Sequence, residues 1–384
     1  MRTVFTLLLC LLLILPLAGQ RGAHANFREL EQLLVIRTMG LDEFRGGVQL
    51  SLASSGSSER GPKRLQASGT SVTAAMDRLS SFSYEEDLFC AHIEQLLIGE
   101  KEAEAGLDAA LAYIERSPEL RLDLPLYIIK GGTATDAVMN VGGGGQGICE
   151  VMEAVHLSLA RRGDSGETPA SQVIRDNERY GAALICALVC RDASETEQSA
   201  DGSGEDATKP LAAAPEGYAV LRDGKLCRYL TKEQSIAVGF LKNRVGVAEV
   251  QLRDKYGGMA VLELTGGGSR IEPVWTEGVL AGLKIQCDVR AALVETRGSG
   301  IQDEAYLDAL TAALEEQVAR FVTSTVEASK ALEADFLGLA AIVERSDPAA
   351  YQALPQPFSA QLPGLELELT VSARLNHAND RKDV

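Results

Sequence analysis

The sequence has few of the residues from which catalytic and metal sites are built. Only four histidines occur in 384 residues, and none forms an HExxH motif or pairs with cysteine at zinc-ligand spacing. The glycine run at 142–145 lacks the GK[ST] ending of a phosphate-binding loop, and no GxSxG elbow occurs. The carboxylate pairs Glu85-Glu86 and Glu315-Glu316 are adjacent, and adjacent residues on a helix do not face each other. The sequence therefore predicts no catalytic, cofactor-binding or metal-binding residue, and it favours a binding or assembly protein over an enzyme.

Paired cysteines are also missing. Apart from Cys10 near the N-terminus, the cysteines are scattered without a CxxC motif: Cys90, Cys149, Cys186, Cys190, Cys227 and Cys287. We expect single buried thiols, the usual environment of an unpaired cysteine. Cys186 and Cys190 would lie on one face of a strand, yet too far apart for a disulfide. We expect a structural role for His92 as well, because it precedes an apolar strand.

Positive charge is in short supply. The chain has 37 lysines and arginines against 54 aspartates and glutamates, which gives a net charge of −17. An acidic surface repels phosphate backbones and anionic lipids, so we expect no nucleic-acid partner and no electrostatic adhesion to a membrane. With 46% apolar and 24% charged residues, the composition is that of a globular protein, and the length suffices for two or three domains.

No hydrophobic run is long enough for a comfortable transmembrane helix, which needs about 20 apolar residues. The longest run, residues 4–17, is apolar apart from Thr6 and Pro16. It follows a positive start at Met1-Arg2 and leads into small residues. This order is typical of a secretory signal, so residues 1–25 are predicted to be a signal segment and the chain to be exported.

The exit of this segment has no lipid acceptor. Leu17-Ala18-Gly19 has the form of a lipoprotein cleavage box, but the next residue is Gln20 where a cysteine would receive the lipid. The nearby Cys10 lies within the apolar run, so no lipidation residue is predicted. Ala23-His24-Ala25 offers an ordinary A-x-A site, and cleavage after Ala25 is favoured over retention as an N-terminal anchor.

In the first half of the chain, apolar strands alternate with amphipathic helices, which predicts a layered α/β arrangement. We expect strands at 33–54 around a turn, 92–98, 124–129 and 182–190, a loop at 55–69, and helices at 71–82, 102–115, 148–159 and 171–180. Residues 26–70 and 148–191 are assigned to a first, discontinuous α/β domain, and residues 71–147 to a second, inserted one. The glycine-rich stretch at 139–147 serves as the re-entry point, because two strands are too little sheet to stand alone.

A composition change marks the next boundary. Residues 192–215 are acidic, small and proline-ended, which is typical of a solvated linker. A C-terminal α/β domain is expected at 216–377, opening with a hairpin around Arg222-Asp223-Gly224. Within it we expect helices at 230–242 and 303–330, strands at 246–252, 259–265, 282–294 and 365–375, and a turn at Gly266 to Gly268.

Short motifs follow one another along the chain in a recognisable order. They are Arg28-Glu29-Leu30, Leu33, Gly40-Leu41-Asp42, His92-Ile93, LLIGE at 96–100, Arg116-Ser117-Pro118-Glu119-Leu120-Arg121-Leu122, Gly217-Tyr218-Ala219-Val220, Asp223-Gly224-Lys225-Leu226, and Ala334-Asp335-Phe336-Leu337-Gly338 followed by Arg345 and Pro348. In this order they resemble the C subunit of spore nutrient-germinant receptors, the Ger(x)C-type family of endospore-forming bacteria. That family shows R-E-[IL]…L…G-[IL]-D at its start, an R-[DS]-P-E-x-R segment, and a closing A-D-I-F-G…R…P.

The resemblance implies a non-enzymatic subunit on the outer face of the spore inner membrane. Such a subunit works with two integral membrane partners in sensing nutrients and starting germination. The resemblance also implies an α+β architecture of three α/β domains, each a mixed or antiparallel sheet packed with helices. Three features depart from the family pattern: Gln20 replaces the lipidated cysteine, Tyr351 stands where a tryptophan is expected, and the acidic linker is longer than usual.

Two other classes of protein stay open from the residues alone. One is a freely secreted or cell-envelope ligand-binding protein without receptor partners. The other is an envelope enzyme whose Asp and Glu residues come together only in three dimensions, in a carboxylate-lined pocket with perturbed pKa values. Genes for two membrane proteins beside this one would favour the receptor subunit, whereas transporter genes would favour the binding protein.

Overall fold

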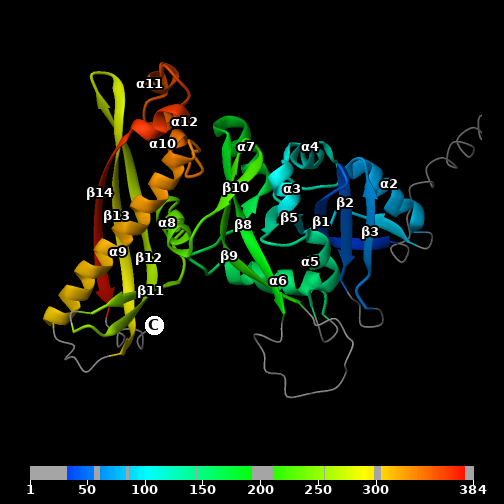
Figure 1. Cartoon of the computed structure of the whole chain (residues 1–384), viewed down its shortest axis with the longest axis horizontal. Helices are drawn as coiled ribbons and strands as arrows, with labels where there is room; N and C mark the ends of the chain where they lie inside the picture. The colour runs from blue at the N-terminus through cyan, green and yellow to red at the C-terminus, as the bar shows by residue number, and fades with distance from the viewer. Residues whose placement is uncertain are drawn as a thin grey trace, which may run out of the picture.

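The computed structural model describes residues 33–55, 61–83, 86–142, 146–192, 211–254, 256–297 and 304–376. Within them the chain forms two sheets with helices around them (Figure 1). The predicted α+β class is confirmed. The signal segment 1–25 and Gln20 lie outside the described residues.

The first sheet runs in the order β10-β9-β8-β6-β5-β1-β2-β3, with β4 beside β1 and β7 beside β6. Its strands are β1 (Leu33–Phe44), β2 (Gly47–Ser54), β3 (Arg64–Gly69), β4 (Asp87–Phe89), β5 (Gln95–Gly99), β6 (Pro125–Ile129), β7 (Thr168–Pro169), β8 (Ala182–Asp192), β9 (Leu211–Arg222) and β10 (Lys225–Tyr229). The central strands β1, β5, β6 and β8 are parallel, and the strands at both ends of the sheet are antiparallel.

Helices cover both faces of this sheet. One face packs against α2 (Val72–Phe82), α3 (Glu100–Ala105), α4 (Asp108–Arg116) and α7 (Ala170–Tyr180). The other packs against α5 (Ala134–Asn140) and α6 (Ile148–Leu159). The central strands are therefore apolar on both sides, as parallel strands under helices are.

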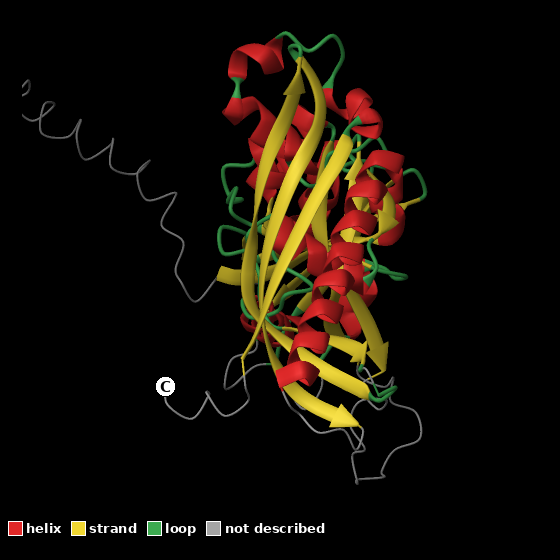
Figure 2. Ribbon diagram, turned by 90° about the vertical axis from the view of Figure 1, so that its left-hand side faces the viewer, coloured by secondary structure: helices red, strands yellow, loops and turns green. Residues whose placement is uncertain are grey.

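The second sheet has the order β11-β12-β13-β14, and its core also includes residues of β8 and β9. Its strands are β11 (Ala248–Arg253), β12 (Met259–Thr276), β13 (Val279–Arg297) and β14 (Glu366–Asn376). Its inner face packs against α8 (Lys232–Leu241), α9 (Glu304–Ala331), α10 (Leu339–Ser346), α12 (Phe358–Gln361) and η5 (Leu362–Gly364), while α11 (Pro348–Gln352) follows α10. Every second residue of β14 is exposed, because one face of the sheet is wet. Figure 2 looks onto this sheet, with its long strands at the front and α9 beside them.

Strand pairing corrects the expected division of the first half. The strands at 33–54 do share a sheet with β8, as expected. However, β5 and β6, which belong to the segment 71–147, lie between β1 and β8 in this same sheet. There β5 pairs with β1, β6 pairs with β8, and β5 and β6 pair with each other. That segment is therefore not a separate unit with its own sheet. All of β5 and most of β6 are buried, and such strands need neighbours on both sides, which only the centre of a shared sheet provides.

The structure also differs from the expected domain boundary at the linker, residues 192–215. Residues 193–210 lie outside the described residues, but Leu211 to Pro215, expected as linker, already belong to β9. This strand runs back antiparallel along β8, and β10 pairs with it. The chain beyond the linker therefore completes the first sheet before it builds the second. The predicted hairpin is confirmed, with positive φ at Asp223 and Gly224.

Three local expectations were wrong. The loop at 55–69 contains β3, which continues the antiparallel pairing of β2. The helix at 102–115 is two helices, α3 and α4, divided at Gly106 with φ +130°. The turn at Gly266 to Gly268 lies inside β12, where a bulge takes up the glycines.

Candidate functional site

The residues of the recognised motifs mostly hold elements together. Asp42 is buried at the end of the central strand β1 and caps α5, more than 90 residues away in sequence. Its carboxylate accepts from the Ala134 N–H at 2.8 Å, the Thr135 N–H at 2.7 Å and the Thr135 hydroxyl at 2.7 Å. Gly99 leaves the space for this carboxylate, since a Cβ there would lie 1.9 Å from Asp42 Oδ1. Asp42 is thus a structural residue.

The closing motif, Ala334 to Gly338, has a similar structural role beside the second sheet. Asp335 is buried and accepts from the Leu339 N–H at 2.9 Å and the Ala340 N–H at 2.6 Å, so it caps α10. Burial raises the pKa of Asp335, and the two backbone donors offset part of that rise. Gly338, with φ +78°, supplies the left-handed turn between the capping residue and the helix. This motif positions a helix and is not a binding site.

The hairpin motif docks the edge of the first sheet. The Gly224 carbonyl accepts from the Leu107 N–H at 2.8 Å, and the Gly224 N–H donates to Asn177 Oδ1 at 2.7 Å. The turn therefore joins the start of α4 to the end of α7.

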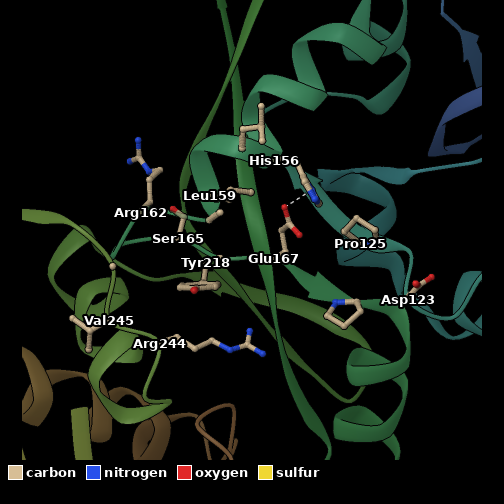
Figure 3. Close-up of a pocket in the computed structure, with 15 residues that line it drawn as sticks. Asp123, Pro125, His156, Leu159, Arg162, Ser165, Glu167, Tyr218, Arg244 and Val245 are labelled. Atoms are coloured by element: carbon tan, nitrogen blue, oxygen red, sulfur yellow. Dashed lines mark ion pairs between the residues drawn. The ribbon is translucent and has the colours of Figure 1, made fainter. Parts of the chain in front are cut away.

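The best candidate for a functional site is a cavity of about 630 Å³ where the first sheet meets the second unit (Figure 3). It is lined by the end of α6, the loop that follows it, the start of β6, Tyr218 of β9 and residues 244–246 after α8. Backbone hydrogen bonds fix this junction: the Gly163 N–H donates to the Val247 carbonyl at 2.9 Å, and the Val247 N–H to the Arg161 carbonyl at 2.7 Å. Gly246 is needed here, since a Cβ would lie 2.3 Å from the Arg162 carbonyl oxygen.

An ion pair lies on the wall of this cavity. His156 Nδ1 of α6 contacts the Glu167 carboxylate, and Figure 3 shows the two side chains directed toward each other. Burial raises the pKa of Glu167, and the imidazole of His156 offsets part of that rise. The neighbouring Tyr127 hydroxyl is buried without a hydrogen-bond partner, and burial together with Glu167 raises the pKa of Tyr127.

Two arginines complete the polar lining. Arg162 forms a bidentate pair with Asp164, at 2.9 and 2.8 Å. Within the described residues, the Arg244 guanidinium makes no side-chain hydrogen bond or ion pair, and its end is directed into the cavity in Figure 3. The Ser165 hydroxyl accepts from the Gly217 N–H at 2.9 Å and so holds the loop to β9.

In the part of the chain that the structure describes, His156 contacts Glu167, and no hydroxyl or thiol hydrogen bonds to His156. No sequence motif pointed to His156, Glu167 or Arg244, because they lie in three separate segments of the chain. Only the folded chain brings them together.

The other residues considered from the sequence are dispersed. His92 is exposed and packs against Phe89, with ring centroids 5.5 Å apart, and His377 and residues 143–145 lie outside the described residues. Glu315 accepts from the Ala373 N–H at 2.9 Å and Glu316 pairs with Arg320, so these adjacent carboxylates are separately engaged.

The six cysteines are unpaired, as expected. Cys90, Cys149, Cys186 and Cys287 are buried, whereas Cys190 is half-buried and Cys227 is exposed. Burial raises the pKa of the Cys90 thiol to about 11, so little of it is thiolate at neutral pH. Among the described residues, no cluster of three or more His, Cys, Asp or Glu side chains could hold a metal ion.

In the described part of the chain, no helix combines the length and the apolar character that crossing a membrane requires.

Comparisons with known proteins define the class to which this architecture belongs. The family described as spore germination protein N-terminal domain matches residues 26–146, and the family described as spore germination B3/GerAC like, C-terminal, matches residues 216–379. A solved structure entitled "Crystal Structure of the GerBC protein" shares the fold, with a TM-score of 0.54 and 15% identity over 88% of this chain and 96% of that chain. A search of curated proteins found no match.

These matches, in order and over most of the chain, make this a spore germination protein. The chain belongs to the Ger(x)C-type family, the C subunits of spore nutrient-germinant receptors. The second match begins at residue 216, where the composition change had placed the start of the C-terminal domain. Strand pairing shows that residues from 216 to the end of β10 nevertheless complete the first sheet.

Proposed function

We propose that this chain is a non-enzymatic subunit of a nutrient-germinant receptor and acts in spore germination at the outer face of the spore inner membrane. The observation that carries the proposal is the pair of family matches, which fall in order on the two halves of the chain. In this proposal the subunit assembles with two integral membrane subunits. The cavity where the first sheet meets the second sheet supports a binding role, because the Arg244 guanidinium on its lining makes no side-chain hydrogen bond or ion pair within the described residues.

A subunit that acts at the membrane surface must be held there. The residue after the lipoprotein-like box is Gln20, which cannot carry a thioether-linked lipid, and the net charge of −17 opposes adhesion to anionic headgroups. A single acyl chain would in any case give only marginal binding. We therefore propose that the partner subunits hold this chain at the membrane after cleavage at Ala25.

Deletion of the gene tests the function. Spores that lack the chain should lose germination with the nutrients that act through its receptor. Re-expression of the full chain should restore the nutrient response. Normal nutrient germination in spores that lack this chain and every other chain of its family would contradict the proposal.

Mass spectrometry of the N-terminus tests the anchoring. We expect the chain extracted from spores to begin at Asn26 and to leave the membrane fraction when the two membrane subunits are deleted. An intact Met1 would instead support an N-terminal anchor, and an acyl mass on any residue would overturn both explanations.

A further inference from the structure

A second cavity, of about 680 Å³, lies on the face of the first sheet that α2, α3, α4 and α7 cover. It lies between the start of α2, helix α4 and the segment Arg116 to Glu119, with Val48 of β2 and Glu102 of α3 on its wall. The motif residues Arg116 to Glu119 therefore line a cavity. Asp42 and Asp335 of two other motifs cap helices, so this motif differs from them in its position.

Glu102 is the unusual member of this cavity. Its side chain is only 7% exposed, yet within the described residues its carboxylate makes no hydrogen bond or ion pair. Buried carboxylates are normally paired, because an isolated buried charge is costly. A carboxylate that is both buried and unpaired, on the wall of an open cavity, has its free oxygens available to a ligand.

The charges around Glu102 decide which ligand fits. Asp42 and Glu43 of β1 are close enough to disfavour its ionised form, and the Asp42 oxygens are already engaged with α5. On the α4 side, Tyr113 is half-buried, while Arg116 and Glu119 are exposed at the rim. Carboxylates therefore outnumber cationic side chains around Glu102, and a cation is the complementary group.

We infer that the Glu102 cavity binds a small organic amine, whose ammonium group donates hydrogen bonds to the Glu102 carboxylate while its hydrocarbon part packs against Val48, Val72 and the alanines of α4. A metal ion fits less well, because calcium and magnesium require several oxygen ligands and no such cluster exists among the described residues. An ammonium group has three donors and is satisfied by one carboxylate with neighbouring hydroxyls, which Thr70, Ser71 and Thr73 supply. This site is independent of the proposed role in germination.

Proton linkage gives the site a distinctive signature. Burial raises the pKa of Glu102 to about 7, and Asp42 and Glu43 add to the rise. An ammonium ligand prefers the ionised carboxylate, so binding below the pKa must expel a proton. The affinity should therefore fall by roughly tenfold for each pH unit below about 7 and stay constant above it.

Calorimetric titration of the full chain with n-butylammonium, beside n-butanol as the neutral analogue, tests the inference. We expect butylammonium to bind more than tenfold tighter than butanol at about pH 8, with the pH dependence given above. Glu102→Gln should weaken the amine at least tenfold, whereas Glu104→Gln, the same change at an exposed position of α3, should alter it by less than about twofold.

A second variant keeps the test independent of any effect of Glu102→Gln on folding. Ala109 is exposed on α4 at the mouth of the cavity, so Ala109→Trp should block butylammonium without disturbing the core. Equal binding of butylammonium and butanol, undiminished binding to Glu102→Gln, or tighter binding of calcium than of the amine would overturn the inference.

Discussion

Asp42 shows how one residue of a motif can stabilise elements that are distant in sequence. Its carboxylate satisfies two backbone donors at the start of α5, one of them buried, and it also accepts from the Thr135 hydroxyl. A buried N–H group without an acceptor costs about 1–3 kcal/mol. The sequence showed Asp42 as part of a pattern, but its function as a cap depends on α5, which lies between β6 and α6 along the chain.

Asp42→Ala should lower the free energy of unfolding by about 2–4 kcal/mol, because two backbone donors lose their acceptor. Urea titration followed by circular dichroism measures this change. The control is Asp77→Ala, at an exposed position of α2, which should stay within about 0.5 kcal/mol of the parent. Equal stability of the two variants would show that Asp42 is not a cap.

Glu102 should make stability depend on pH. Its folded-state pKa is raised to about 7 by burial and by the nearby carboxylates, from an ordinary value of 4.5. Below about pH 4.5 the group is protonated in both states and has no effect. Between the two values the unfolded chain releases the proton and the folded chain keeps it, so stability falls as pH rises, and the loss is complete above about pH 7.

Glu102→Gln should therefore be more stable than the parent by about 2–3 kcal/mol at about pH 8 and equal to it near pH 4. Thermal unfolding at the two pH values, without added amine, measures the difference. A variant that is less stable at high pH would mean that the carboxylate is paired and stabilising.

Individual elements were predicted well wherever the pattern of the chain repeats. The alternation of LELELTVSARL gave β14, and Leu310, Leu314, Val318 and Phe321 gave α9. Prediction failed at β3, which is polar, and at the three glycines at 266–268, because a glycine run reads as a turn. In the folded chain, β13 pairs with this stretch on both sides of the bulge and holds it in the sheet.

Gly267 tests this reading of the bulge. It has φ +150°, and a Cβ there would lie 2.3 Å from the Asp288 carbonyl oxygen of β13. Gly267→Ala should destabilise the chain by about 1–3 kcal/mol from backbone strain alone, with the clash adding to it. Gly364→Ala, where no atom lies within 4 Å, is the control and should change stability by less than about 0.5 kcal/mol in the same urea titration. Unaltered stability of the Gly267 variant would mean that the bulge can relax.

At the scale of the whole molecule, β9 ties the two halves together. It pairs with β8 from Ala182↔Arg222 to Asp192↔Leu211, although the acidic segment separates the two strands in sequence. Tyr218 and Val220 of β9 also belong to the core that contains α8 and the second sheet. The parts of the chain before and after the acidic segment therefore share the hydrogen-bonded pairing of β8 with β9 and one hydrophobic core.

A protease site engineered between residues 193 and 210 should reveal this connection. After cleavage, the two fragments should elute together in gel filtration and separate only in denaturant, because the pairing of β8 with β9 does not depend on the connecting segment. A control chain without the site should stay in one piece under the same protease. Separation of the fragments in native buffer would show instead that the C-terminal domain is self-contained from residue 216.

The sequence by itself determined the α+β class, most of the helices and strands, and membership in the Ger(x)C-type family. These follow from local periodicity and from motifs whose residues lie within a few positions of one another. Export and anchoring at residues 1–25 are expectations of the same local kind.

Only the tertiary structure decided the order of the strands and the composition of the two cavities. Apolar strands such as β5 and β6 could pair with many other strands. They lie between β1 and β8 because their buried backbone N–H and C=O groups need hydrogen-bond partners on both sides, and the whole sheet must provide them. His156, Glu167 and Arg244 meet because α6, its loop and the segment after α8 converge. Glu102 of α3 becomes a buried carboxylate on the wall of a cavity that it shares with α2 and α4, and no spacing along the chain encodes that position.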